Sequence, residues 1–361
     1  MKVRYTFRCY PTDTQAQALS RVFGHTRFVW NWALRLRTDA WGHGERINYN
    51  QTSAALTALK KTAEYQWLNE VSCVPLQQSL RNLQKAFLNF FAGRTRRPRF
   101  KKKRHKQAAE YTASAFKYQD GELSLAKIGK LKVRWSRPFQ SQPTTVTVIQ
   151  TPTGRYYVTL VLDEMPQPYN KTGELIGIDL GINRLATLSN GEHIPNLKFT
   201  KKHERQLAKA QKSLSRKTKG SGRWIRQRMK VARVHERLTN ARIDHIHKIT
   251  TDLVRRFDVI AVEDLNVRGM LRNKKLAKQI SDASFGRFVS MLQYKCVWRG
   301  KELVKIDRYF PSSKRCSCCG YIAQTLPLSV RSWQCPECQS IHDRDENASR
   351  NILNFAVGHP V

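Results

Sequence analysis

Four cysteines arranged as two closely spaced pairs constrain this chain more than any other feature of its sequence. Two residues separate Cys316 from Cys319, two separate Cys335 from Cys338, and fifteen residues separate the pairs. Four thiolates at this spacing close a tetrahedral zinc site that leaves no position for water, so its role is structural. The sequence therefore predicts a zinc ribbon around one Zn²⁺. Cys318 could replace Cys319 as a zinc ligand only if the first pair had the spacing C-x-C, with one residue between the two cysteines.

The chain also carries a large excess of positive charge. Lysine and arginine number 65 against 27 aspartate and glutamate residues, which gives a formal net charge of +38. Solubility needs far less, so a polyanion is the expected partner, and nucleic acid is the usual one because each neutralised phosphate releases a condensed counterion. The competitor is an anionic membrane, but the sequence holds no run of about 18 apolar residues and no signal peptide. We therefore expect a cytoplasmic protein with no membrane partner.

Part of this charge is concentrated in residues 94–106. Nine of these thirteen residues are lysine or arginine, and Pro98 argues against a helix. A charge run can also be a solvated surface or a nuclear localisation signal. With this net charge we predict contact with nucleic-acid phosphates. The predicted contact residues are Arg94, Arg96, Arg97, Arg99, Phe100, Lys101, Lys102, Lys103, Arg104 and Lys106.

The first ninety residues predict one strand followed by a small helical domain. Residues 1–10 alternate as a strand does, and Thr12 with Asp13 offers an N-cap to a helix. A second helical stretch follows Ser53, and a third runs over about 76–91. Several aromatic side chains of this domain offer surfaces for stacking on nucleobases, but their helical spacing favours a packed core. These aromatic residues are Trp30, Trp32, Trp41, Trp67 and Phe90.

Residues 110–165 change to a strand pattern, and the segment 145–162 predicts a β-hairpin. Short strands separated by polar turns fit a small barrel, for which the oligonucleotide-binding kind is one option. Helical patterns return between about 199 and 257. They are interrupted at residues 217–222 by the sequence KTKGSG, which predicts two long helices joined by a turn.

Three acidic residues occupy unusual positions. Asp179 ends an apolar strand in the sequence LIGID, Glu263 ends another in VIAVE, and Asp345 stands where a polar turn gives way to a helix. A charge at the end of a buried strand is costly unless something pairs with it, so incidental surface positions explain it poorly. Together the three residues predict the acidic cluster of an RNase H-like fold, in which two strands and a helix bring carboxylates together around divalent cations.

Magnesium is the cation that these carboxylates suit, because Mg²⁺ prefers hard oxygen ligands and keeps several waters. Two such ions about 4 Å apart activate the attacking water and stabilise the leaving oxygen in phosphodiester cleavage. We predict that Asp179 bridges two Mg²⁺ ions and that Glu263 and Asp345 each complete one, although Mn²⁺ suits the same ligands. Asp264 and Asp343 are alternative metal ligands that rank lower. Asp264 should point to the strand face opposite that of Glu263, and Asp343 lies further before the helix than Asp345.

Eight motifs follow one another along nearly the whole chain. They are RYTFRCYPTDTQAQALSRVFGHTRFVWNWAL at the start, PRFKKK in the basic run, then GIDLG, NARIDHIHK, VEDLN, SSKRCSCCG, WQCPEC and HDRDENASRNIL. This ordered set is highly specific, and it resembles that of the TnpB proteins, the OrfB products of transposon insertion sequences.

The resemblance implies an RNA-guided DNA endonuclease with a RuvC-type nuclease domain, related to type V CRISPR effectors and associated with the nucleoid of a bacterial or archaeal cell. A guide RNA from the transposon end would bind the helical and barrel domains. The protein would read a short motif beside the matching double-stranded DNA, while base pairing reads the target. By the same resemblance, Asp179, Glu263 and Asp345 fall on the family's three catalytic positions.

The implied fold class is multi-domain α+β. It combines a helical recognition domain, a small oligonucleotide-binding-like β-barrel called the wedge, and an RNase H-like RuvC α/β domain with an inserted zinc ribbon. The expected ranges are 1–10 for the first wedge strand, 11–93 for the helical domain, 94–170 for the remaining wedge, 171–311 for the RuvC domain with a helical insertion at about 199–257, 312–340 for the ribbon and 341–361 for the final RuvC segment.

Three other functions compete with guided cleavage. A guided repressor binds DNA without cutting, but such proteins usually lose catalytic carboxylates, and this chain has all three. A transposase shares the RNase H-like fold but generally lacks a ribbon between the second and third acidic residues. An unguided zinc-ribbon binder would leave the placement of Asp179 and Glu263 unexplained.

Overall fold

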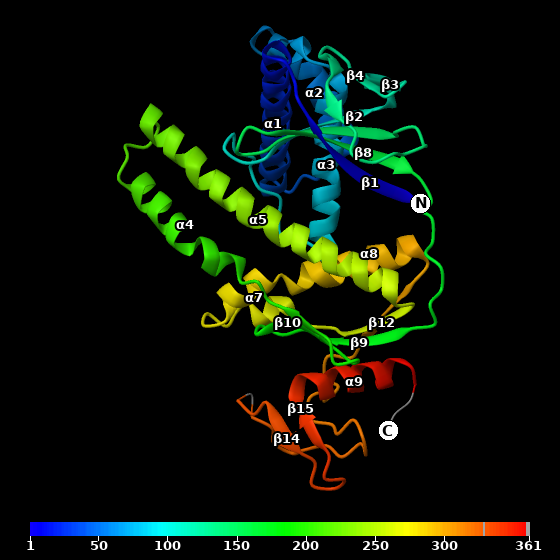
Figure 1. Ribbon diagram of the computed structural model, residues 1–361. Coiled ribbons are helices and arrows are strands. Elements are labelled where there is room, and N and C mark those ends of the chain that lie inside the picture. Colours follow the sequence, from blue (N-terminus) through cyan, green and yellow to red (C-terminus); the bar gives the residue numbers. More distant parts are fainter. Residues whose placement is uncertain (328, 359–361) are drawn as a thin grey trace. The chain divides into compact units, whose positions relative to one another are not determined.

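A computed structural model describes residues 1–327 and 329–358, which form two compact units, one of Met1–Met165 and one of the described residues from Pro166 onward (Figure 1). Each unit has its own buried apolar residues. Residue 328 of the predicted ribbon and residues 359–361 of the predicted final segment lie outside the described residues.

The first unit contains an antiparallel sheet of five strands in the order β2-β7-β8-β1-β6 and a smaller sheet in the order β3-β4-β5. The predicted strand at residues 1–10 is confirmed, since β1 buries Val3, Phe7 and Cys9. The predicted hairpin is also confirmed, because β7 and β8 pair antiparallel. The strands are β1 (Lys2–Cys9), β2 (Gln107–Thr112), β3 (Phe116–Gln119), β4 (Glu122–Leu125), β5 (Gly129–Leu131), β6 (Val133–Arg134), β7 (Thr145–Gln150) and β8 (Tyr156–Asp163).

Two helices of the first unit, α1 and α2, begin at capping boxes that the sequence only partly revealed. Its helices are α1 (Asp13–Gly42), α2 (Tyr49–Leu59) and α3 (Cys73–Phe91), with 3-10 turns η1 (Ala63–Glu70) and η2 (Ala113–Ala115). Thr12 and Gln15 cap α1 where the sequence predicted its start. The predicted start of α2 after Ser53 is too late, because Asn48 and Gln51 form a second capping box.

Aromatic side chains of these helices do not all belong to the core. Trp30 is buried, as its helical spacing predicted. Trp41, however, is 54% exposed, and Phe91 at the end of α3 is 64% exposed. The expectation of a packed core is therefore wrong for Trp41, because this residue stands in the last turn of α1, where most side chains face solvent.

The second unit is built on a mixed sheet of five strands in the order β11-β10-β9-β12-β13. The central strand β9 runs parallel to β12, which runs parallel to β13, whereas β10 and β11 are antiparallel to their neighbours. Both carboxyl ends of β9 and β12 therefore lie at the same edge of the sheet. The strands are β9 (Leu175–Asp179), β10 (Arg184–Leu188), β11 (His193–Pro195), β12 (Val259–Glu263) and β13 (Glu302–Ile306).

Helices cover both faces of this sheet (Figure 1). Ile260 and Val262 of β12 pack in a large apolar cluster with residues of α5 (Gly222–Arg256) and α8 (Phe285–Arg299). Ala261 points to the other face, where it packs with Ile306 of β13 and Ile352 of α9 (Arg344–Ala356). Because β12 is covered on both faces, it is apolar throughout until it reaches Glu263.

The remaining elements of the second unit include a long helical hairpin. Helix α4 (Phe199–Ser215) and helix α5 lie on either side of a turn, as the sequence KTKGSG predicted. Short helices α6 (Val267–Met270) and α7 (Ala277–Ala283) follow β12. Two further strands, β14 (Ser332–Gln334) and β15 (Ile341–Asp343), pair antiparallel, and β15 leads directly into α9.

Gly177 allows α9 to approach β9 closely. A Cβ atom added at this position would lie 2.1 Å from the backbone oxygen of Ser349 and 2.8 Å from the backbone nitrogen of Leu353. Any side chain here would force the helix away from the strand. We expect Gly177→Ala to lower the free energy of unfolding by about 3 kcal/mol, measured by urea denaturation.

Gly286 provides the matched control for this substitution. It lies in α8, and an added Cβ would meet no heavy atom within 4 Å. Gly286→Ala should therefore be neutral or should raise stability by up to about 1 kcal/mol, since alanine favours helix. Equal effects of the two substitutions would contradict the close approach of α9 to β9.

Candidate metal centres

Two of the predicted acidic residues lie at matching positions on neighbouring strands. Parallel pairing of β9 with β12 places Ile178 opposite Val262. The next residue on each strand is the acid, so Asp179 and Glu263 emerge together at one edge of the sheet, where both are partly exposed. The sequence pattern of an apolar strand ending in an acid therefore leads to two carboxylates on adjacent strand ends.

The third acid reaches the same region from α9. Asp345 lies in the first turn of this helix, whose N-cap is Asp343. The Asp343 carboxylate accepts hydrogen bonds from the backbone N–H groups of Asp345 and Glu346, at 2.9 and 3.1 Å. This cap fixes where the helix begins and hence where Asp345 is carried. The Oδ1 atom of Asp345 also lies 3.3 Å from Nη1 of Arg331.

The charges of Asp345 and Glu263 both act on Asp179. Burial, followed by the negative charges of Asp345 and Glu263, raises the pKa of Asp179 to about 7. The nearby Arg344 guanidinium and the backbone N–H of Leu180 oppose this shift. Burial also raises the pKa of Glu263. Like charges held together in this way favour protonation or a bound cation.

The raised pKa predicts how stability depends on pH when no divalent cation is added. Because Asp179 binds a proton more tightly in the folded protein, its contribution to stability is complete below the unfolded pKa of about 4 and is lost as pH rises to about 7. We expect wild type to lose about 2 kcal/mol relative to Asp179→Asn between about pH 5 and pH 7, measured by urea unfolding. A constant difference across that range would contradict the assignment.

The two rival acids are engaged elsewhere. Asp264, next to Glu263, forms an ion pair with Arg308. Asp343 uses its carboxylate to cap α9, and its Oδ2 atom lies 3.5 Å from Nη1 of Arg184. Their lower rank as metal ligands stays a prediction.

The four predicted zinc cysteines form a compact cluster. The Sγ atoms of Cys316, Cys319, Cys335 and Cys338 all lie within 4.8 Å of one another. Cys316 and Cys338 are 3.6 Å apart at Sγ, as are Cys319 and Cys335. Within the described part of the chain, the three carboxylates do not form so tight a group.

A histidine that the sequence did not single out also reaches this cluster. The Nε2 atom of buried His342 lies 3.1 Å from the Cys316 sulfur. Cys316, Cys318 and His342 form a second group whose donor atoms lie within 4.8 Å of one another. The first group uses Cys319, as the C-x2-C spacing predicted, and the second offers an alternative role for Cys318.

Two asparagines of α9 connect the cysteine cluster to the helix that carries Asp345. Asn347 accepts a hydrogen bond from the backbone N–H of Ser317 at 2.9 Å and donates to the carbonyl of Arg315 at 2.7 Å. Asn351 donates to the same carbonyl at 2.6 Å and to the carbonyl of Ser312 at 2.8 Å. Both asparagines are buried and stand one turn apart on the helix. That spacing was visible in the sequence, but its partners were not.

Arg344 is another residue that sequence reasoning missed. Although charged, it is only 8% exposed, and its Nη1 atom donates to the carbonyl of Pro327 at 2.7 Å. Its positive charge lowers the pKa of Asp179. The backbone of this arginine therefore begins α9, while its side chain places a cation near the acidic cluster.

In the first unit, the basic segment 94–106 is attached to α1. The indole N–H of Trp30 donates to the carbonyl of Arg99 at 3.0 Å, and the Asn31 side chain bonds both backbone groups of Lys101. Lys101 also places its ammonium 3.8 Å from the Trp30 ring centroid. All ten side chains predicted to contact phosphate are exposed. The predicted contacts themselves stay a prediction.

Family models match the chain over three ranges. One described as "Probable transposase" (OrfB of IS605) matches residues 147–274, one described as "Cas12f1-like, TNB domain" matches residues 285–352, and a "Helix-turn-helix domain" matches residues 1–46.

Within the described part of the chain, no helix is long and apolar enough to cross a membrane.

The fold is the multi-domain α+β fold of the Cas12f type. A solved structure of a Cas12f1–sgRNA–target DNA complex matches with a TM-score of 0.56 and 12% identity, over 95% of this chain and 83% of that chain. A relative from Streptomyces pristinaespiralis, named as an RNA-guided DNA endonuclease, is 52% identical over 98% of this chain and 89% of its own length. The Escherichia coli protein InsQ, named likewise, is 32% identical over 99% and 92%. The chain belongs to the TnpB (OrfB) family of transposon-encoded proteins.

Proposed function

We propose that this protein is an RNA-guided DNA endonuclease that cleaves phosphodiester bonds at Asp179, Glu263 and Asp345. The observation that carries the proposal is that Asp179 and Glu263 end two adjacent parallel strands, while the charge of Asp345, at the start of a helix, acts on Asp179. The names of the relatives from Streptomyces pristinaespiralis and Escherichia coli support the same reaction. Because all three acids are present and converge, a repressor that binds without cutting is the less favoured function.

The acidic cluster fits divalent cations. Burial, followed by the negative charges of Asp345 and Glu263, raises the pKa of Asp179, and a bound cation would offset the repulsion between these charges. We assign Asp179, Glu263 and Asp345 as the residues that would hold two Mg²⁺ ions, and the chemistry that such ions would supply is activation of water and stabilisation of the leaving oxygen. A two-ion centre does not require all three carboxylates within 4.8 Å of one another, because its ligands surround a pair of ions.

The cysteine cluster fits one structural Zn²⁺. With zinc–sulfur bonds of about 2.3 Å, tetrahedral geometry requires sulfur–sulfur distances of about 3.8 Å. The two separations of 3.6 Å are close to that value. We therefore assign Cys316, Cys319, Cys335 and Cys338 as its ligands and residues 312–340 as a zinc ribbon. By its place in the chain, this ribbon sets the position of β15 and α9.

The first unit supplies the nucleic-acid surface in this proposal. The antiparallel sheet around β1, β7 and β8 serves as the wedge domain, helices α1 to α3 serve as the recognition domain, and the exposed basic segment contacts phosphate. The partners are a guide RNA derived from the transposon end and double-stranded target DNA. The Cas12f1 complex of similar fold contains an sgRNA and target DNA.

Purification of the protein with RNA from its own transposon locus tests the proposal. The complex is incubated with Mg²⁺ and DNA that either matches or does not match the end of the bound RNA. We expect cleavage of the matching DNA alone. RNA-dependent binding without cleavage would instead establish the repressor function, and cleavage independent of the RNA would exclude guided recognition.

A further inference from the structure

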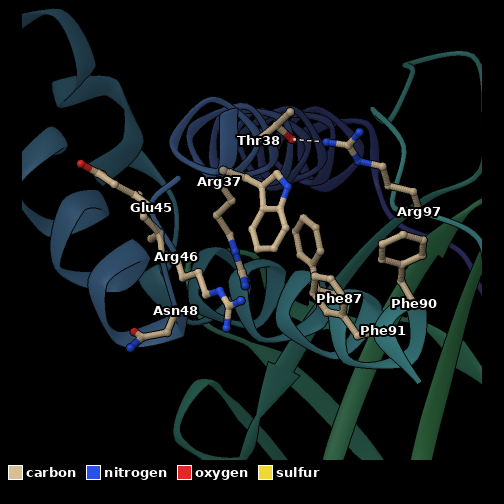
Figure 2. A pocket seen from close by; sticks show the side chains of 11 residues that line it. Arg37, Thr38, Glu45, Arg46, Asn48, Phe87, Phe90, Phe91 and Arg97 are labelled. Carbon is tan, nitrogen blue, oxygen red and sulfur yellow. Dashed lines mark hydrogen bonds between the residues drawn. The ribbon is translucent and has the colours of Figure 1, made fainter. Parts of the chain in front are cut away.

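The helical part of the first unit contains a cavity that the proposed cleavage centre does not use. It has a volume of about 630 Å³ and lies between the last turn of α1, the start of α2 and the end of α3 (Figure 2). This volume is in the range of sites that hold small organic groups. Aromatic rings and arginines dominate its lining.

Two exposed aromatic rings form part of the wall. Trp41 is 54% exposed and Phe91 is 64% exposed. Their ring centroids are 6.3 Å apart, and Phe91 stacks in turn on Phe87 at 6.2 Å with an interplanar angle of 20°. Exposure of neighbouring rings to water is unfavourable, and a flat apolar ligand that covered them would lower the free energy. A nucleobase has such a flat face.

Arginines surround these rings. The Arg37 guanidinium lies 4.4 Å from the Phe87 ring centroid and donates to Gln84 at 2.7 Å. Arg46 lies 5.5 Å from the Trp41 ring centroid. Figure 2 shows the guanidinium groups of Arg37 and Arg46 pointing into the same region, whereas the Glu45 carboxylate points away from it.

Positive charge in the cavity lacks acidic partners. Arg97, at the other side, donates to the Thr38 hydroxyl at 3.4 Å. In residues 1–327 and 329–358, no carboxylate forms an ion pair with Arg37, Arg46 or Arg97. Unpaired guanidinium groups beside exposed rings match a ligand that is anionic at one end and flat at the other. An apolar protein helix would satisfy the rings but not the charges.

We infer that this cavity binds one unpaired nucleotide of a single-stranded segment. Its base stacks on Trp41 and Phe91, and its flanking phosphates contact Arg46 and Arg97. The inference rests on the proposed function, because it assumes that the first unit holds nucleic acid. It adds a defined base-stacking site to a basic surface that otherwise binds nucleic acid only through its phosphates. RNA and DNA both supply this chemistry.

Binding of labelled single strands to the full protein tests the inference. The probes are oligouridylate of about 12 nucleotides, the same ribose-phosphate strand without bases, and oligodeoxyuridylate, compared by fluorescence anisotropy at one fixed salt concentration. Wild type should bind oligouridylate about tenfold more tightly than the abasic strand. The double variant Trp41→Ala/Phe91→Ala should bind both strands equally.

Two further variants separate stacking from loss of the fold. Leu88→Ala alters a side chain of α3 that is 58% exposed but does not line the cavity, and it should keep the wild-type preference. Trp41→Phe should keep most of this preference, because a ring remains.

Comparison of the two base-containing strands separates RNA from DNA. Tighter binding of oligouridylate than of oligodeoxyuridylate identifies RNA as the ligand, and equal binding identifies a site that recognises base and phosphate alone.

Equal binding of the base-containing and abasic strands by wild type would overturn the inference, as would a preference that survives in the double variant. In both cases the protein still binds nucleic acid, so guided cleavage would stand. Failure of wild type to bind any strand would count against the proposed function as well.

Discussion

Replacement of Asp179 by asparagine should abolish DNA cleavage while stabilising the protein. The Asp179 carboxylate is the one whose pKa is raised by both other acids, so its loss removes the ligand proposed to bridge two ions. A single electrostatic donor at an active site is worth about 10²- to 10³-fold in rate, and we expect a loss of at least about 10³-fold here. Without added divalent cation, the unfolding temperature should rise because a carboxylate repelled by Asp345 and Glu263 is gone.

Asp264→Asn is the matched control for this prediction. Asp264 follows Glu263 directly in sequence but pairs with Arg308. Its replacement should change the cleavage rate by no more than about threefold, the effect of a surface ion pair. Rates of both variants are measured with RNA-bound protein and matching DNA. An Asp179→Asn protein that keeps about a tenth of wild-type cleavage would exclude Asp179 as the bridging ligand.

Among the substitutions considered, loss of the cysteine cluster should have the second largest effect on DNA cleavage. Structural zinc contributes about 10 kcal/mol or more to the folding of small zinc domains, so Cys316→Ser should unfold the segment 312–340. Unfolding there removes the backbone partners of Asn347 and Asn351 and frees the start of α9. Because Asp345 lies in that first turn, we expect cleavage to fall by about 100-fold although no catalytic residue has changed.

Zinc content and cleavage are measured together for this variant. Wild type should contain one zinc per chain, and Cys316→Ser should contain none. Cys318→Ser is the control, since Cys318 is exposed and lies outside the four-cysteine group. Wild-type behaviour of Cys318→Ser supports the four-cysteine site, whereas loss of zinc in that variant would instead establish the group of Cys316, Cys318 and His342. Full cleavage by zinc-free protein would contradict coupling of the cluster to Asp345.

Much of the fold follows from local patterns in the sequence. Alternation predicted β1 and the β7–β8 hairpin, and the breaker KTKGSG predicted the α4–α5 pair. The cysteine spacing predicted a cluster that the structure brings together. Such patterns succeed because they reflect the geometry of single elements or of one loop. The start of α2 was missed because Asn48 and Gln51 form a capping box with no serine or threonine at the cap.

Other features depend on contacts between distant segments. Arg344 looks like any charged residue in HDRDEN, and only the fold buries it beside Pro327 and Asp179. Likewise, the need for glycine at position 177 comes from a helix that follows far later in the chain. Trp41 is the opposite case, because its helical spacing suggested burial and the helix end left it open. No periodic pattern encodes where one element stops covering another.

The parts of the acidic centre are made at very different times during protein synthesis. Strand β9 emerges from the ribosome well before β12, and α9 follows only after the cysteine cluster. At a synthesis rate of about 5 to 20 residues per second, Asp345 is added on the order of ten seconds or more after Asp179. The unit Met1–Met165, with its basic segment, is complete by then. The nascent chain therefore carries the complete basic segment well before it carries the complete acidic cluster.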